Sequence, residues 1–206
     1  MEKFSKFSKI SKFPKIKRIA NENGGYFLTK EAENAGITRA ALSLYAKQGK
    51  LQHVKRGVYL LPERFEDEMF NIQATAPLVV YSHDTALYLH DLCDRDPLIY
   101  TVTVPCGYHS AALRNKNIRI RTDRKETHNS NVALVSTIYG NKVRTYDIER
   151  TLCDCLKPRC RIDISLITEA FKRYAKSKKK DLHKLMAYAE SIGVDAKVRA
   201  YMEVLL

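Results

Sequence analysis

The chain has 206 residues, 45% of them hydrophobic, so it can bury a core and lacks the composition of a disordered chain. Its 36 Lys and Arg outnumber its 23 Asp and Glu, which gives a net charge of +13. No apolar run approaches the ~20 residues of a membrane span. The basic start is not followed by the apolar segment and cleavage site of a signal peptide. We therefore expect neither a membrane protein nor a secreted one.

Positive charge is concentrated at the amino end of the chain. Residues 1–62 contain 13 Lys and Arg and 4 Asp and Glu, whereas residues 63–206 contain 23 Lys and Arg and 19 Asp and Glu. A basic amino-terminal region followed by a region with little net charge is typical of a polyanion-binding module joined to another domain. The alternative is a basic surface that only keeps the protein soluble. Pro62 and the acidic stretch after it mark the boundary, so we predict a DNA-binding domain at 1–62 and a second domain at 63–206.

The first residues form a comb of lysines at every third position, each followed by an aromatic or aliphatic residue. These lysines are Lys3, Lys6, Lys9, Lys12 and Lys15. A three-residue period drifts about 60° per repeat around an α-helix, so the comb makes no steady stripe. We interpret it as a basic arm that neutralises phosphates. The alternatives are a helix whose apolar residues meet partners on several sides, and a frayed or crystal-ordered terminus. Pro14 suits the first turn of a helix that continues through residue 23, with Ile16 and Ile19 facing the core.

The stretch from Gly24 to Glu63 predicts a helix-turn-helix. Thr29 is placed to cap a short helix, and Gly36 ends it, because glycine adopts the left-handed conformation cheaply. Thr38 caps a second helix that runs to about Gln48. Helix, glycine turn and helix in this order are the elements of the motif.

The second of these helices has two different faces when its residues are placed at 100° intervals. One face consists of Ala41, Leu42, Tyr45 and Ala46, which can pack on the preceding helices. The other face consists of Arg39, Ala40, Ser43, Leu44 and Lys47. Small, polar and basic side chains suit an element that enters a major groove, although an ordinary amphipathic helix has the same pattern. Leu44 either meets a thymine methyl or packs on a neighbour.

Two short alternating segments follow the helix and predict a hairpin. Gly57 permits a tight turn between them, and Lys55 and Arg56 lie at its tip. A basic hairpin directly after a helix-turn-helix is a wing. The candidate DNA-binding residues are therefore Arg39, Ser43, Lys47, Lys55 and Arg56.

The remainder of the chain predicts a mixed α+β domain with a central sheet and carboxy-terminal helices. Strands are expected at 78–81, 99–105, 117–123, 132–140 and 141–146. Helices are expected at 65–76, at 83–92 with Ser82 as cap, and at 147–157, 163–176, 181–193 and 195–206. The lysine-rich segment 176–180 is expected to be a solvated loop.

Catalytic and metal-binding patterns are weak. Asp123 and Lys125 form the D-x-K of a PD-(D/E)xK nuclease, but the acids upstream of them lie in an expected loop. Asp94 and Asp96 have the spacing of a nucleotidyltransferase pair, yet no Gly-Ser turn precedes them. We therefore expect no enzyme, and keep a nuclease using Asp123 and Lys125 as an alternative.

Cysteine and histidine also give no site. The five cysteines, an odd number without scaffold spacing, indicate reduced thiols in a cytoplasmic protein. Cys153 and Cys155 point about 200° apart on a helix and cannot share an ion; with Cys160 they are expected to be free thiols. The scattered histidines His83, His90 and His109 are expected to be structural or surface residues. We expect no metal and no cofactor.

The segments GYFLTKEAENAGITRAALSLYAKQGKLQHVKRGVYLLPE, SHDTALYLHDL, TVTVP and YDIERTLCDCLK, in this order, resemble the AbiEi antitoxins. These proteins belong to type IV toxin–antitoxin and abortive-infection systems of phage defence. The likeness runs from about Pro14 onward and leaves the comb outside. It implies a winged-helix domain that binds inverted repeats before its own operon as a transcriptional repressor. It also implies a second domain that opposes a nucleotidyltransferase toxin without a stable complex, and no catalytic site. A winged-helix regulator that senses a small ligand is a further alternative.

Overall fold

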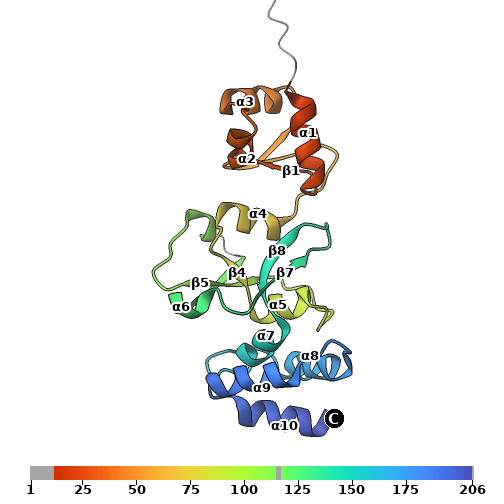
Figure 1. Ribbon diagram of the computed structural model, residues 1–206, viewed down its shortest axis with the longest axis vertical. Helices are drawn as coiled ribbons and strands as arrows, with labels where there is room; N and C mark the ends of the chain where they lie inside the picture. The colour runs from red at the N-terminus through yellow and green to blue at the C-terminus, as the bar shows by residue number, and fades with distance from the viewer. Residues whose placement is uncertain (1–11, 115–116, 206) are drawn as a thin grey trace, which may run out of the picture. The chain divides into compact units, whose positions relative to one another are not determined.

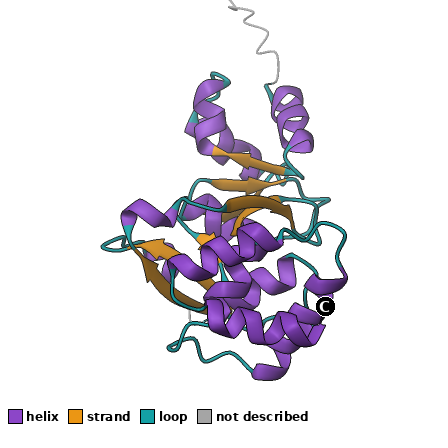
Figure 2. Cartoon of the chain, turned by 60° about the horizontal axis from the view of Figure 1, so that its bottom comes forward, coloured by secondary structure: helices purple, strands orange, loops and turns teal. Residues whose placement is uncertain are grey.

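The computed structural model describes residues 12–114 and 117–205. The chain divides into two units, Met1–Thr75 and Ala76–Leu206, each with its own sheet. Figure 1 labels the elements along the chain, and Figure 2 separates helices from strands by colour. The mixed α+β class predicted from the sequence is confirmed.

Over its described residues, 12–75, the first unit is built from four helices and a three-stranded antiparallel sheet with the order β1-β3-β2. Its elements are α1 (Phe13–Glu22), β1 (Tyr26–Leu28), α2 (Thr29–Asn34), α3 (Arg39–Lys47), β2 (Gln52–Lys55), β3 (Val58–Leu60) and α4 (Glu68–Thr75). Both neighbours of β3 pair with it in register at Tyr59, which lies opposite Phe27 and opposite His53. The sheet separates two buried clusters, one that includes Phe27 and Tyr59 and one that includes Tyr26 and Leu60.

Helix α4 belongs to this first unit, although the charge step suggested a boundary at Pro62. The amide of Asp67 donates to the Tyr26 hydroxyl over 2.7 Å. The rings of Tyr26 and Phe70 lie 4.4 Å apart. The buried Tyr26 thus ties the acidic segment after Pro62 to the first sheet, because its ring and its hydroxyl both find partners there.

The core of the first unit lies between its helices and sheet. Ile16, Phe27 and Leu42 are fully buried, and Ile37 re-enters this core after the turn at Gly36. Ile19 packs against the same cluster. Helix α1 begins one residue before Pro14, which places the proline in its first turn.

One helix cap agrees with the sequence and one does not. The Thr38 hydroxyl accepts a hydrogen bond from the amide of Ala41 over 3.3 Å, which confirms Thr38 as the cap of α3. The prediction for α2 was wrong. Thr29 is its first helical residue, and the carboxylate of Glu31 accepts from the Leu28 amide over 2.7 Å. A glutamate three residues after the cap position can replace a capping hydroxyl by reaching back.

The second unit contains a five-stranded mixed sheet with the order β6-β5-β4-β8-β7. Strands β5 and β6 are parallel, as are β4 and β8, while the β4–β5 and β7–β8 pairs are antiparallel. Its strands are β4 (Val80–Tyr81), β5 (Tyr100–Pro105), β6 (Ile118–Asp123), β7 (Val132–Ser136) and β8 (Lys142–Tyr146). Its helices are α5 (His83–Leu89), the 3-10 helix η1 (Ala111–Leu113), α6 (Lys125–His128), α7 (Ile148–Cys155), α8 (Ile164–Lys176), α9 (Leu182–Ser191) and α10 (Asp195–Leu205).

The last four helices gather beyond α5 and share a large core (Figure 1). Leu152 on α7, Phe171 on α8 and Leu185 on α9 are fully buried in it. The carboxylates of Asp147, Asp163 and Asp181 accept from backbone amides at the starts of α7, α8 and α9. These caps explain why each predicted helix begins where it does.

Ser82 holds the predicted cap position of α5, but its side chain makes no capping bond. Its hydroxyl instead bonds to Thr103 and to the ring of His83, both at 2.9 Å.

No helix within residues 12–114 and 117–205 has the length and apolar character to cross a membrane.

Candidate functional site

The outward face of α3 carries the polar side chains that the sequence singled out. Leu42 is fully buried, and Ala41, Tyr45 and Ala46 pack against the core of the first unit. The opposite face is exposed and consists of Arg39, Ala40, Ser43, Leu44 and Lys47. The two faces are therefore divided as expected, and the side chain of Leu44 is 52% exposed instead of packed on a neighbour. The contact of this face with DNA stays a prediction.

Arg39 is held on this face by a partner that the sequence reading did not name. Its Nη2 donates to Oε1 of Glu33 on α2 over 2.8 Å, across the turn between the two helices. Both side chains are more than half exposed, so this ion pair contributes little to stability. Its consequence is orientation, because it holds the long Arg39 side chain outward before any ligand arrives.

The β2–β3 hairpin presents its basic pair at the turn. Arg56 is exposed at the tip, Lys55 is half-buried, and Gly57 has φ +80°, a conformation that favours glycine. The amide of Thr29 donates to the Gly57 carbonyl over 2.9 Å, which joins the hairpin turn to the start of α2.

Two lysines of the comb have a local role. Lys12 Nζ donates to the Gly36 carbonyl over 2.6 Å, and Lys15 Nζ donates to the Ala35 carbonyl over 2.9 Å. These carbonyls end α2, where a cation also interacts favourably with the helix dipole. Lys3, Lys6 and Lys9 lie outside the described residues. Lys12 and Lys15 thus help to close the first unit, a role that the three-residue period did not reveal.

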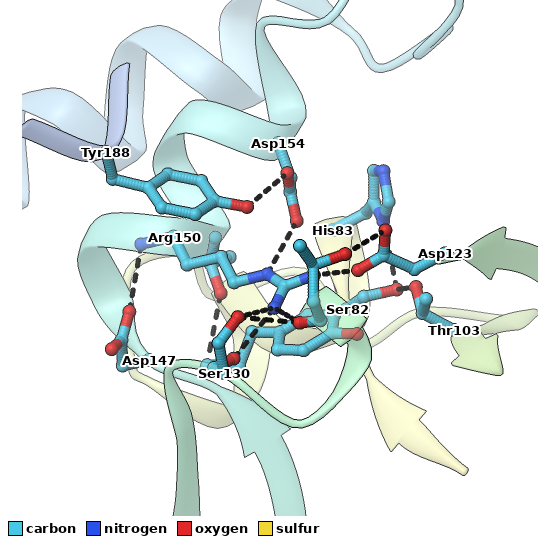
Figure 3. Close-up of polar contacts among 12 residues, drawn as sticks. Ser82, His83, Thr103, Asp123, Ser130, Asp147, Arg150, Asp154 and Tyr188 are labelled. Carbon is cyan, nitrogen blue, oxygen red and sulfur yellow. Dashed lines mark hydrogen bonds and ion pairs between the residues drawn. The ribbon is translucent and has the colours of Figure 1, made fainter. Parts of the chain in front are cut away.

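The second unit contains a buried arginine at the centre of a polar network (Figure 3). Arg150 on α7 is only 2% exposed. Its Nη1 donates to the carbonyls of Thr127 and Ser130, both over 2.7 Å. Its Nη2 bonds to Asp123 over 2.5 Å, and its Nε bonds to Asp154 over 3.4 Å. The guanidinium therefore has acceptors on all three nitrogens, as a buried charge requires.

Aromatic rings complete the surroundings of this arginine. The guanidinium carbon lies 3.4 Å from the ring centre of Tyr146 and 5.7 Å from that of Tyr188. Burial lowers the pKa of Arg150, but the two tyrosines, Asp154 and Asp123 outweigh it, so the pKa is raised overall. Arg150 is a permanent cation that joins α7 to β6 and to the loop before β7.

Asp123, the candidate nuclease acid, is part of the same network. Burial raises its pKa, but hydrogen bonds from Thr127, Arg150 and the Arg124 amide outweigh burial and lower it. Its two oxygens are engaged by these donors. Lys125 is exposed at the start of α6, and Asp94 pairs with Arg173. Among the described residues no three His, Cys, Asp or Glu side chains are grouped to hold a metal ion.

The predicted structural histidines and thiols are largely buried. Burial lowers the pKa of His83 to about 4, and burial also lowers that of His90, whose Nε2 lies 2.7 Å from the Tyr146 carbonyl. His109 is exposed. Cys153 and Cys155 are buried and Cys160 is half-buried, and burial raises the pKa of all three thiols. A raised pKa removes thiolate, so these cysteines are poor nucleophiles and poor metal ligands.

Comparison with known proteins finds a family match within the first unit. Residues 14–62 match the family model described as transcriptional regulator, AbiEi antitoxin, so the resemblance read from the sequence is confirmed over these residues. No curated protein matches the chain. The crystal structure of the RV2827C protein from Mycobacterium tuberculosis is similar with a TM-score of 0.54 and 11% identity. The match covers 91% of this chain and 79% of that chain, and at this identity it shows a shared fold alone.

Proposed function

We propose that this chain is an antitoxin and a transcriptional autorepressor, which binds inverted repeats before its own operon through the first unit. The family match over residues 14–62 supports a regulator and antitoxin role. The operator, the toxin and the division of work between the two units are the finer parts of the proposal.

The element order of the first unit supports a winged helix-turn-helix. In this arrangement α3 is the recognition helix and the β2–β3 hairpin is the wing. The single observation that carries the proposal is the exposed face of α3. It combines a long bidentate donor, Arg39, with Ser43 and Lys47, and is free of acidic residues. An α-helix with such a face fits the major groove, where an arginine can bond to both acceptors of a guanine. The exposed Leu44 is placed to meet a thymine methyl.

The remaining basic residues of this unit suit the DNA backbone. Lys55 and Arg56 at the hairpin tip are point contacts for phosphates, which position the protein without reading sequence. Lys3, Lys6 and Lys9 precede α1 and would add phosphate contacts as an arm. Lys12 and Lys15 contribute less to such an arm, because their amines already bond to the end of α2.

We assign the second unit to opposition of a nucleotidyltransferase toxin, without catalysis and without a stable complex. A nuclease would need the Asp123 carboxylate to bind magnesium. That carboxylate instead accepts from Arg150, Thr127 and the Arg124 amide. Displacing these donors would leave the buried Arg150 charge without its partner, which costs several kcal/mol.

The test compares two arginines that differ in the proposed contact. The full chain is titrated by fluorescence anisotropy with the duplex from upstream of its own gene and with a scrambled duplex. Arg39→Ala should weaken operator binding by ~1–3 kcal/mol and leave scrambled-duplex binding nearly unchanged, because a base contact is lost. Arg56→Ala should weaken both by a similar factor, because a phosphate contact carries no sequence information.

Equal losses on both duplexes for Arg39→Ala would mean that Arg39 contacts phosphate, and α3 would not be the helix that reads the DNA sequence.

The same variants test in cells whether repression and toxin neutralisation belong to different units. Both should lose repression of a reporter and still protect cells that express the toxin gene from the same operon. A loss of protection in parallel with repression would contradict a separate antitoxin unit.

A further inference from the structure

A cavity of about 420 Å³ opens in the second unit between β6 and the segment that follows α7. Four of its lining side chains are cationic: Arg121 on β6, Arg150 on α7, and Lys157 and Arg159 beyond it. His83 and Thr122 also line it. A volume in this range is typical of small-molecule sites and exceeds the needs of a single inorganic ion.

The charges around the cavity do not cancel. The carboxylates of Asp123 and Asp154 are its acidic members, and they pair with Arg150 and with Lys157. Within the part of the chain that the structure describes, neither Arg121 nor Arg159 takes part in an ion pair. Two arginines without an ion-pair partner therefore line the same cavity and give it a positive net charge.

The guanidinium of Arg121 has unused donors. Its Nη1 donates to the Arg159 carbonyl over 3.4 Å. Its Nε is buried without a hydrogen-bond partner among the described residues. Nε and Nη2 form the side of an arginine that binds two oxygens of one oxyanion. A buried unpaired donor costs about 1–3 kcal/mol, and an anionic ligand would remove this cost.

His83 lies on the cavity wall with one ring nitrogen held by Ser82. The Thr103 hydroxyl donates to Ser82 Oγ over 2.9 Å, and Ser82 Oγ lies 2.9 Å from Nδ1 of His83. Nε2 is therefore the ring nitrogen left for a ligand, and it is a donor in the tautomer whose proton is on Nε2. Figure 3 shows this chain of contacts beside Asp123. His83 also has φ +56°, a strained value for a residue other than glycine and one that is common at functional sites.

We propose that this cavity binds the phosphate group of a small phosphorylated ligand, with Arg121 and Arg159 as the charged contacts and His83 as a neutral donor. Paired guanidinium groups favour a phosphate over an uncharged ligand, because each provides charge-assisted hydrogen bonds. The cavity holds an organic group in addition to the phosphate. Inorganic phosphate, a sugar phosphate and a mononucleotide share this chemistry and are distinguished by titration.

The experiment uses the full chain at pH 7 and isothermal titration calorimetry with four probes. The probes are inorganic phosphate, ribose 5-phosphate, adenosine 5′-monophosphate and, as uncharged control, adenosine. We expect saturable binding with one site for at least one phosphorylated probe and none for adenosine. Arg121→Gln and Arg159→Gln should each raise Kd at least tenfold for that probe.

A control variant separates a site from general charge attraction. Lys178→Gln removes an exposed cation of the same unit outside the cavity and should not change Kd. Arg159 is exposed, so its variant reports on binding even if Arg121→Gln lowers the melting temperature.

Three outcomes would overturn the proposal: no saturable binding of any phosphorylated probe, equal binding of adenosine, or an equal loss in Lys178→Gln and Arg159→Gln. The operator affinity of Arg159→Gln should equal that of the parent protein. Failure of the phosphate site and failure of DNA recognition are therefore read from different measurements.

Discussion

Arg39 and Arg150 both lie on helices and both pair with a carboxylate, yet they occupy opposite environments. In the first unit the side chain of Arg39 is 79% exposed and that of Glu33 is 56% exposed. In the second unit the side chains of Arg150 and Asp154 are 2% and 4% exposed. The charge of Arg39 can therefore be removed with little harm to the fold of the first unit, whereas the second unit depends on the buried charge of Arg150.

The energies follow from these environments. An exposed ion pair contributes about 0–1 kcal/mol, because water screens it and two long side chains lose freedom. Removing one partner of a buried pair costs about 3–5 kcal/mol, because the other charge stays buried without compensation. The positive charge of the first unit is thus available for a ligand, and that of Arg150 is not.

The largest expected effect is on the buried arginine. Arg150→Met should destabilise the second unit by about 3–5 kcal/mol, since Asp123 and Asp154 lose their common partner. Hydrogen exchange measured by mass spectrometry reports the two units separately. Peptides from α7 and β8 should lose protection while peptides from α3 keep theirs.

Arg39→Ala is the matched control and should change protection by less than ~0.5 kcal/mol in either unit, as expected for a surface substitution. Similar losses for the two substitutions would contradict the contrast between the units.

The second largest effect is a loss of protein stability at acidic pH. Burial lowers the pKa of His83 to about 4, below its ordinary 6.5, although Asp154 and Asp84 oppose this and Arg121 assists it. The unfolded chain therefore binds a proton between pH 6.5 and 4 that the folded chain does not. Stability should be complete above pH 6.5 and fall by about 3 kcal/mol as the pH approaches 4.

His83→Asn removes this dependence, and asparagine tolerates the positive φ of the site. Urea unfolding followed by circular dichroism at pH 7 and pH 4.5 measures the difference. The variant should lose less stability on acidification than the parent, while the exposed His109→Asn should behave like the parent. A parent protein as stable at pH 4.5 as at pH 7 would show that His83 is charged in the fold.

The lysine comb is expected to have a smaller effect, on affinity, because it adds positive charge to the first unit. Deleting residues 1–11 removes Lys3, Lys6 and Lys9 and keeps the two lysines that bond to α2. The slope of log affinity against log salt should decrease by up to ~2.7, at about 0.9 for each phosphate contact. Operator preference should be retained. An unchanged slope together with a lower melting temperature would make the comb a structural segment.

The smallest effect is on the stability of the first unit, where the exposed charges of Lys12 and Lys15 have a structural role. Lys12→Gln and Lys15→Gln should each lower the free energy of unfolding of the first unit by ~0.3–1 kcal/mol, since each cation leaves the end of α2. Arg18→Gln, an exposed position on α1, serves as the control and should have no effect. Chemical denaturation at low and high salt measures both. The loss should shrink at high salt if it is electrostatic.

Local patterns predicted most elements of the fold, because caps, glycines and periodicity act within a few residues. Thr38 and Gly49 bound α3, and Asp147, Asp163 and Asp181 begin three helices of the second unit. The error at Thr29 has the same local origin. The cap position is Leu28, and the carboxylate of Glu31 accepts from its amide and, over 2.6 Å, from the Asn23 amide group.

The second unit was less predictable, because its organisation depends on distant pairings. The parallel pairs of strands have no hairpin signal, and Arg150 meets Asp123 from 27 residues away. Arg150 and Asp154 are four residues apart, a spacing that was visible. It is equally typical of a solvated helix face, so only tertiary structure distinguishes a buried pair from an exposed one. The cavity beside β6 was hidden for the same reason.

If Arg39 and Arg56 contact DNA as proposed, the hydrogen bond from the Thr29 amide to the Gly57 carbonyl has a consequence for the shape of the DNA. It fixes the hairpin tip against α2, which packs with α3 in one core, so the span between Arg56 and Arg39 is set before binding. A protein in which this distance is fixed loses little conformational entropy on binding, so the DNA duplex must deform to match it. Affinity should therefore depend on base steps that neither arginine touches: flexible TA or CA steps between the two contacts should favour binding, and a stiff A-tract there should weaken it.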